Sequence, residues 1–295
     1  MTRSRLSSRN LARAGLSLFI ISGLTLGCSS STKPTYLKEN IEQAMQDICR
    51  NEYSIDVKAT LVGQTLWIYM PVEDLLAKSD KPEKYLERFA IEDNRVEFKN
   101  GRLELEYLVK VIPEKEKFQE YKYNKAVLEK INNVWKVMRR VIFSMGRSGK
   151  NEPQFFCLVT ADIKNGFETK ETFYYLDLKK VSYEYISWGE YQHRTIDETN
   201  ISPEIIGDKE GQHLDYKDMT LEGFVARQIQ HRIKLKFQKP EVDRNADIDK
   251  EVLKIAIYTI KIYGIRDFTA AELNNLLTQN RIILNQAAIL ARPID

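Results

Sequence analysis

The chain has 295 residues, of which 43% are hydrophobic and 29% charged, with 45 Lys and Arg against 42 Asp and Glu. This composition is typical of a water-soluble globular protein with one large or two small domains, and it excludes a polytopic membrane protein, a low-complexity chain and a disulfide-dense module. Four arginines and no acid lie within residues 1–27, so the remainder has 45 − 4 = 41 basic against 42 acidic side chains and a net charge of −1. A body this close to neutrality lacks the basic surface of a nucleic-acid-binding protein.

The N-terminal residues have the pattern of a secretory signal. Residues 1–13 are polar and basic, and residues 14–27 are uncharged. An uncharged run of this length is too short for a bilayer core, which takes about 20 residues, but it fits the apolar region of a signal peptide. The run ends in the letters LTLG and is followed by Cys28.

This junction resembles the cleavage site of a bacterial lipoprotein signal, with Thr25 and Leu26 where a leucine and a small residue are usual. The resemblance implies cleavage after Gly27, transfer of a diacylglyceryl group to the Cys28 thiolate, and acylation of the freed amine. Two or three acyl chains anchor a protein stably, which one chain does not. By analogy with sorting in double-membrane bacteria, Ser29 favours the periplasmic face of the outer membrane. An ordinary cleaved signal and an uncleaved buried segment are the alternatives.

Residues 28–36 are expected to form a polar tether, and residues 37–112 a first α+β unit. Apolar residues recur at helical spacing up to Cys49, and the residues that follow alternate between apolar and polar as in a half-buried strand. Asn100-Gly101 predicts a tight hairpin, because a two-residue turn needs positive φ values. The expected elements are a helix over 37–49, strands over 53–61 and 65–70, short helical pieces over 72–78 and 82–89, and hairpin strands over 95–99 and 102–112.

The charged residues 113–122 are expected to link this unit to a second α+β unit over 123–240. Apolar residues from Val127 to Met145 step by three and four, which predicts a long helix with a broad buried face. The other expected elements are strands over 154–163 and 167–178, helices over 183–194 and 221–230, a strand over 232–237, and a long loop over 195–218. The order helix, strand, turn, strand occurs twice, at 37–70 and 124–178, which suggests a structural duplication that the residue identities do not support.

Residues 241–295 are expected to form helices packed on the second unit. Residues 252–262 are apolar almost all round, as in a buried helix. Residues 269–272 (Thr-Ala-Ala-Glu) form a capping box, which predicts the start of a last helix that ends near Ala291. The sequence therefore predicts an α+β fold in which helices pack on antiparallel β-hairpins.

The chain contains no motif typical of a metal or cofactor site. Residues 146–150 (GRSGK) have two residues between their glycines where a phosphate loop has four, so a helix cap and loop is favoured. Acidic residues alternate from Asp243 to Glu251, but Ile248 and Lys254 stand where a calcium loop needs Gly and Glu, so an acidic first helical turn is favoured over calcium. We expect neither a metal nor a cofactor. No metal-ligand spacing relates the three histidines, His193, His213 and His231.

Two cysteines follow the predicted lipid attachment site. Cys49 lies on the apolar side of the first predicted helix, and Cys157 lies among Phe and Leu residues. A thiol in such surroundings is usually buried and inert. In an oxidising envelope the two could instead form a disulfide, whose loop of about 100 residues would stabilise the fold by up to roughly 4–5 kcal/mol.

An aromatic segment is the first candidate ligand site. Tyr185, Trp188 and Tyr191 recur every third residue, with His193 and Arg194 beside them. Such rings could form a platform for a sugar ring or a peptide. A core helix whose aromatic residues expose only their polar tips is the favoured alternative.

A basic stripe is the second candidate. Arg232, Lys234 and Lys236 would share one face of the strand expected over 232–237. This stripe could contact anionic lipid headgroups or an acidic partner. Lysines also protect edge strands from unwanted pairing, and the sequence does not decide between these roles.

These features favour a lipid-anchored, non-catalytic interaction or scaffold protein that faces the periplasm and binds another envelope protein. A small-ligand or glycan-binding lipoprotein that uses residues 183–194 is the alternative. A hydrolase acting on envelope polymers is the third hypothesis, for which the sequence offers no nucleophile–base pair or metal cluster.

Overall fold

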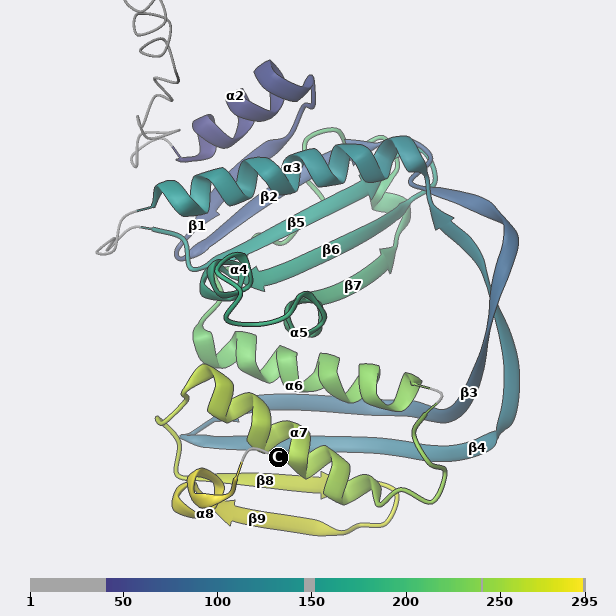
Figure 1. The fold of residues 1–295 in the computed structure, drawn as a ribbon, viewed down its shortest axis with the longest axis vertical. Coiled ribbons are helices and arrows are strands. Elements are labelled where there is room, and N and C mark those ends of the chain that lie inside the picture. Colours follow the sequence, from purple (N-terminus) through teal and green to yellow (C-terminus); the bar gives the residue numbers. More distant parts are fainter. Residues whose placement is uncertain (1–40, 146–151, 240, 294–295) are drawn as a thin grey trace, which may run out of the picture. The chain divides into compact units, whose positions relative to one another are not determined.

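The computed structural model describes residues 41–145, 152–239 and 241–293 (Figure 1). All of them belong to one compact unit, Tyr36–Asp295. Within these ranges seven α-helices and nine strands form two mixed sheets, which confirms the predicted α+β class. The predicted signal with Cys28 lies outside the described residues, as does the glycine-containing loop at residues 146–150.

The first sheet, called sheet A, has five strands in the order β1-β2-β5-β6-β7. Strands β2 and β5 are parallel, and the other neighbours are antiparallel. Helices α2 (Ile41–Tyr53) and α3 (Lys125–Ser144) cover one face, as Figure 1 shows. The strands are β1 (Lys58–Val62), β2 (Thr65–Val72), β5 (Phe155–Asp162), β6 (Phe167–Tyr174) and β7 (Ile196–Ile201).

Strand β2 is apolar on both sides because both of its faces are covered. Its even-numbered residues, such as Ile68, pack against the core under α2 and α3. Trp67 and Tyr69 point to the opposite face, where they pack against Ile205 of the short 3₁₀ helix Pro203–Ile205. A strand buried on both faces shows a continuous apolar run rather than alternation.

The predicted repeat of helix, strand and strand is present as α2-β1-β2 and α3-β5-β6. The two copies do not have the same arrangement. Both helices pack into one core on the same face of sheet A. Strand β1 is antiparallel to β2, which is parallel to β5, so the strands that follow the two helices run in opposite directions.

The second sheet, called sheet B, has four strands in the order β3-β4-β8-β9, with β4 and β8 parallel. Helices α6 (Leu221–Gln238), α7 (Ile248–Tyr263) and α8 (Gln286–Ala291) contribute to its core. Two further helices, α4 (Tyr175–Ser182) and α5 (Trp188–Arg194), lie between β6 and β7 in the sequence. The strands are β3 (Leu76–Lys99), β4 (Arg102–Tyr123), β8 (Ala270–Asn275) and β9 (Arg281–Asn285).

Strands β3 and β4 form the predicted hairpin, and its turn is as expected. Asn100 and Gly101 have φ values of 51° and 71°, both in the left-handed region. The strands are much longer than predicted: β3 includes residues 76–78 and 82–89, and β4 includes the expected linker, 113–122. Of the short helix expected over 72–78, Val72 ends β2 and residues 73–75 connect it to β3. Those predictions of secondary structure were wrong.

The outer part of this hairpin has no core, and its strands are joined by the backbone ladder and by exposed ion pairs. Ion pairs join β3 to β4 across the ribbon, and most side chains there are exposed. A two-stranded ribbon with solvent on both faces has no apolar alternation, so its sequence resembles a linker. The pairs are Lys84–Glu116, Glu87–Lys117 and Arg88–Glu114, at 2.6 to 2.7 Å.

The strand expected over 232–237 is the second half of helix α6. This helix is buried on two sides: Phe224 packs in a cluster with Phe155 and Ile196 of sheet A, whereas Ile229 and Ile233 pack in the core of sheet B. A helix with two buried sides carries apolar residues at many spacings, which imitate the alternation of a strand. As a helix, it cannot present Arg232, Lys234 and Lys236 on one face, because successive members are 200° apart.

The C-terminal residues are only partly helical. Helix α7 covers the predicted buried segment and ends at Gly264. The expected capping box leads instead into β8: Thr269 donates its backbone N–H to Gly101 of the hairpin turn, and Glu272 pairs with Arg281 of β9 at 2.7 Å. Because β4 offers an open edge, these residues pair with it in preference to forming a helix, and the last helix is only α8.

Candidate functional site

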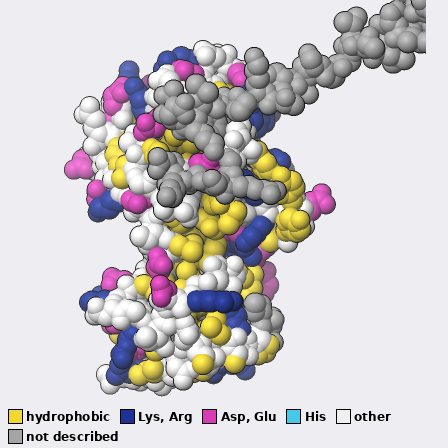
Figure 2. All heavy atoms as spheres, turned by 90° about the vertical axis from the view of Figure 1, so that its left-hand side faces the viewer, with side chains coloured by type: hydrophobic (Ala, Val, Ile, Leu, Met, Phe, Trp, Pro, Cys, Tyr) yellow, Lys and Arg dark blue, Asp and Glu magenta, His cyan; other side chains and the backbone are white. Residues whose placement is uncertain are grey.

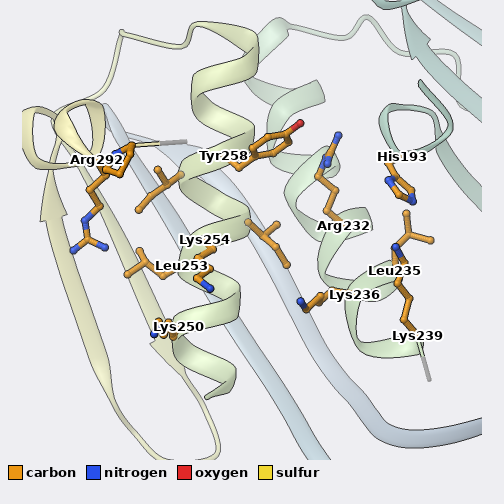
Figure 3. A pocket seen from close by; sticks show the side chains of 13 residues that line it. His193, Arg232, Leu235, Lys236, Lys239, Lys250, Leu253, Lys254, Tyr258 and Arg292 are labelled. Carbon is orange, nitrogen blue, oxygen red and sulfur yellow. The ribbon is translucent and has the colours of Figure 1, made fainter. Parts of the chain in front are cut away.

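A groove of about 440 Å³ lies between α6 and α7, within the size range of small-molecule sites (Figure 3). Its apolar wall includes Leu235, Leu253 and Ile257. Among the described lining residues there is no carboxylate. The lining has six basic side chains, Arg232, Lys236, Lys239, Lys250, Lys254 and Arg292.

Helical spacing brings these cations together from two elements. Arg232 and Lys236 are four residues apart on α6, and Lys250 and Lys254 are four apart on α7, so each pair shares a helix face. Figure 3 shows the side chains of both helices around the same cavity, with Arg292 on the α7 side. A helix assignment for residues 232–237 would have placed Arg232 and Lys236 on one face, but not next to Lys250 and Lys254.

Three of the six cations have acidic partners and three do not. Glu251 lies 2.7 Å from Lys236 and 3.2 Å from Lys254. Arg232 lies 3.0 Å from Glu190. No carboxylate of the described ranges forms an ion pair with Lys239, Lys250 or Arg292.

The end of the groove nearest α5 is held by a network of partly buried polar groups. The Tyr258 hydroxyl donates to Glu190 at 2.9 Å, and the Arg232 guanidinium lies 5.1 Å from the centre of the Tyr258 ring. Arg194 donates to Glu190 at 2.7 Å. Burial opposes ionisation of Glu190, but the hydrogen bond from Arg194 and the charge of Arg232 outweigh it and lower the pKa of this carboxyl. These contacts hold the Arg232 side chain in place at the groove wall.

The five aromatic-segment residues are dispersed by the structure. The helix expected over 183–194 is only α5, which Ser187 caps by accepting a hydrogen bond from the Glu190 backbone. Tyr185 and Trp188 are 80% and 62% exposed, whereas Tyr191 is 3% exposed, so no platform of three rings forms. Arg194 is buried, and it donates to Asp177 at 2.8 Å.

His193 is the one member of this group that lines the groove. Burial and the charges of Lys239 and Arg232 lower the pKa of His193, so the ring is neutral at pH 7. It adds a polar, uncharged group to the basic wall.

Exposed aromatic rings form a second surface, called the aromatic cluster and defined as Phe143, Tyr183, Tyr185 and Trp188. Trp188 is included because it is exposed and close in sequence; its ring contacts that of Tyr191 at 5.5 Å. The Phe143 and Tyr183 ring centres are 5.6 Å apart, and those of Tyr183 and Tyr185 are 6.4 Å apart. The end of α3 and the segment from α4 to α5 lie on the left of Figure 1, and Figure 2, which views that side, shows hydrophobic side chains gathered there.

His213 is a partly buried residue whose role the sequence did not predict. Its Nδ1 lies 2.6 Å from Asp208 and its Nε2 lies 2.8 Å from Glu168, a residue of β6. Burial opposes the charged form, but the two carboxylates outweigh it and raise the pKa of His213. With both nitrogens donating, the ring has no lone pair for a base or a metal, so it ties the loop before α6 to sheet A.

Cys49 and Cys157 do not form the suggested disulfide. Both thiols are free, and both are buried. Cys49 packs in the core under α2 and α3, whereas Cys157 packs with Trp67 on the opposite face of sheet A. The sheet therefore separates the two thiols. Burial raises the pKa of each thiol to about 12, so neither is a thiolate nucleophile at neutral pH.

The alternating acidic residues around the start of α7 accept hydrogen bonds within the fold. Asp247 caps α7 by accepting from the Lys250 backbone, and Asp249 accepts from Tyr107, Asn275 and Asn280. The acidic first turn is thus confirmed. Among the described residues, no group of three or more His, Cys, Asp or Glu side chains could hold a metal ion.

Comparison of the chain with models of protein families, with curated proteins and with solved structures finds no match. None of the described helices has both the length and the hydropathy required to span a bilayer. The geometry above therefore carries the functional argument.

Proposed function

We propose that the protein is a lipid-anchored, non-catalytic component of the bacterial envelope, which faces the periplasm and binds another envelope protein. The anchor would be the acyl chains on Cys28, after cleavage at Gly27. The body would act as an interaction or scaffold unit held close to the bilayer.

The aromatic cluster is the observation that carries this proposal. Tyr183, Tyr185 and Trp188 are each at least 62% exposed, and an exposed group of large apolar rings has a cost in water that a partner removes. Tyr and Trp are also the residues that most often dominate binding energy at protein interfaces. A glycan platform receives less support, since Tyr191 lies in the core.

The partner proposal is tested by photo-crosslinking in intact cells. A photoreactive phenylalanine analogue replaces Tyr185 in the full-length chain, and we expect one reproducible crosslinked envelope protein. The same analogue at Tyr121, a 54% exposed aromatic residue on β4, is the matched control and should capture little. Trp188→Ser in the Tyr185 analogue background should reduce the crosslink about tenfold, the effect of losing roughly 1.4 kcal/mol at a hot spot.

The anchor is tested in the same cells by labelling with radioactive palmitate. We expect label on the chain and none on a Cys28→Ala variant, which should also leave the membrane fraction. An unlabelled chain would contradict the anchor. The interaction role would be contradicted by equal crosslinking from Tyr185 and Tyr121. It would also be contradicted if Trp188→Ser lost binding to a glycan and not to a protein partner.

A further inference from the structure

We propose that the groove between α6 and α7 binds a single phospholipid molecule with an anionic head group, which it takes from a bilayer. This site lies apart from the aromatic cluster, and it goes beyond the proposed function by assigning a ligand to the chain.

The groove has an excess of positive charge. Six cations line the groove and no described carboxylate does, and three of the six, Lys239, Lys250 and Arg292, have no acidic partner among the described residues. Like charges gathered around one cavity repel each other, and a bound anion removes this repulsion. The groove is therefore complementary to an anionic group such as a phosphate diester.

The groove also has an apolar wall. Leu235 on α6 and Leu253 and Ile257 on α7 line the same cavity as the cations (Figure 3). A free phosphate or a sugar phosphate would leave these side chains in contact with water. An acyl chain would cover them and remove their apolar surface from water. The groove thus matches a molecule that is anionic at one end and apolar at the other.

Several of the groove's cations are already held in place by neighbouring side chains. Glu251 fixes Lys236 and Lys254 from outside the lining, and Glu190 and the Tyr258 ring fix Arg232. Side chains that are ordered before binding lose less conformational entropy when the ligand arrives. The volume of about 440 Å³ holds the head group and the first methylene groups of such a lipid, and it is too small for a macromolecular segment.

The test measures transfer of lipid from vesicles to the protein. The chain carrying Cys28→Ala, which has no acyl group of its own, is mixed with vesicles of phosphatidylglycerol or of phosphatidylcholine with the same acyl chains. Protein is separated from vesicles by flotation and examined by native mass spectrometry. We expect one phosphatidylglycerol per protein and at least about tenfold less phosphatidylcholine.

Charge reversal at the groove supplies the site-specific arm. Lys239→Glu combined with Lys250→Glu should lower phosphatidylglycerol uptake by about 10- to 100-fold, since each juxtaposed charge contributes on the order of 1 kcal/mol. Both lysines are exposed, so the double variant should fold. Lys234→Glu is the matched control, because Lys234 lies on α6 but does not line the groove. It should bind lipid like the unchanged chain.

Four results would overturn the proposal. These are equal uptake of the two lipids, equal loss in Lys234→Glu and in the double variant, displacement of bound lipid by inorganic phosphate alone, and flotation of protein with vesicles without lipid in the protein fraction. Because this test uses a chain without the anchor or the partner, its outcome is independent of the palmitate and crosslinking experiments.

Discussion

At the scale of single residues, a buried ion pair joins Asp177 of α4 to Arg194 of α5, and it is linked to α7 through Tyr263. Their side chains are 1% and 7% exposed, and they lie 2.8 Å apart. The Tyr263 hydroxyl of α7 donates to the second oxygen of Asp177, and Arg194 also contacts Glu190. Removing one member of such a pair leaves a buried charge without its partner, which is more costly than the pair's net contribution to folding.

We therefore expect Arg194→Met to lower the free energy of unfolding by about 3–5 kcal/mol, measured by urea denaturation. In an Asp177→Asn background the same substitution should cost at least about 1 kcal/mol less, because no uncompensated carboxylate remains. Lys180→Met is the control. Lys180 lies 3.6 Å from the same carboxylate but is 37% exposed, so the loss should be about 0–1 kcal/mol. Equal losses for Arg194 and Lys180 would contradict this explanation.

At the scale of elements, helix α6 is buried on two sides, and one of them carries a histidine. His231 is 8% exposed, and its Nε2 has no hydrogen-bond partner among the described residues. Burial, together with the charges of Arg232 and Lys234, lowers the pKa of His231 to about 4. The folded state therefore holds this ring neutral at a pH where the unfolded chain, with a pKa of about 6.5, already binds a proton.

The resulting contribution to stability is complete above pH 6.5 and is lost as the pH falls from 6.5 toward 4. The free energy of unfolding falls when the pH is lowered from 7.5 to 5. We expect this fall to be about 2 kcal/mol smaller in His231→Phe, which lacks the titrating ring, than in the unchanged chain. Urea denaturation at both values gives this difference, and taking the difference cancels the contributions of His213 and of Glu171. Identical pH dependence in the two proteins would show that His231 does not titrate as stated.

The elements also show what a single sequence can predict. Apolar periodicity located α2, α3 and α7 well, and the turn residues Asn100-Gly101 located the hairpin. These signals are local, so tertiary contacts did not change them. The outer hairpin was missed because its strands are held by cross-strand ion pairs in solvent, and β8 was missed because its partner β4 lies far away in the sequence.

The candidate site was predictable only in part. Arg232, Lys236 and His193 were singled out and do line the groove, but their association with Lys250, Lys254 and Arg292 depends on the packing of α6 against α7. The interpretation of residues 232–237 as a strand placed Arg232, Lys234 and Lys236 on one face. In helix α6, Lys234 does not share a face with the other two. The favoured interpretation of a core helix fits Tyr191 but not the exposed Tyr185 and Trp188, because a three-residue period does not distinguish a helix from the loop that precedes α5.

At the scale of the whole molecule, sheet B combines a hairpin from the first half of the chain with strands from its end. Strand β8 adds to the free edge of β4, and Phe268, Leu273 and Ile289 complete the core that α6 and α7 cover. Without β8 and β9, the hairpin would lose its strand neighbour at the β4 edge and would keep only the core that it shares with α6 and α7.

We expect a chain that ends at Arg266 to lose protection against hydrogen exchange in β3 and β4 by at least about tenfold more than in β2 and β5. The reason is that β2 and β5 keep their own neighbours and the core under α2 and α3. A chain that ends at Pro293 is the control and should exchange like the intact protein. Uniform loss of protection across both sheets would show that the two sheets unfold as one cooperative unit.

The parallel contact between β4 and β8 has a consequence for how the polypeptide is made. The hydrogen bond from Thr269 to Gly101 links residues 168 positions apart. At the usual speed of translation, the ribosome needs roughly 10 to 30 s to cover that distance. During this interval Leu103 and Leu105 lie on a strand whose edge has no neighbour, and a nascent chain in that condition can pair with another copy or with a chaperone.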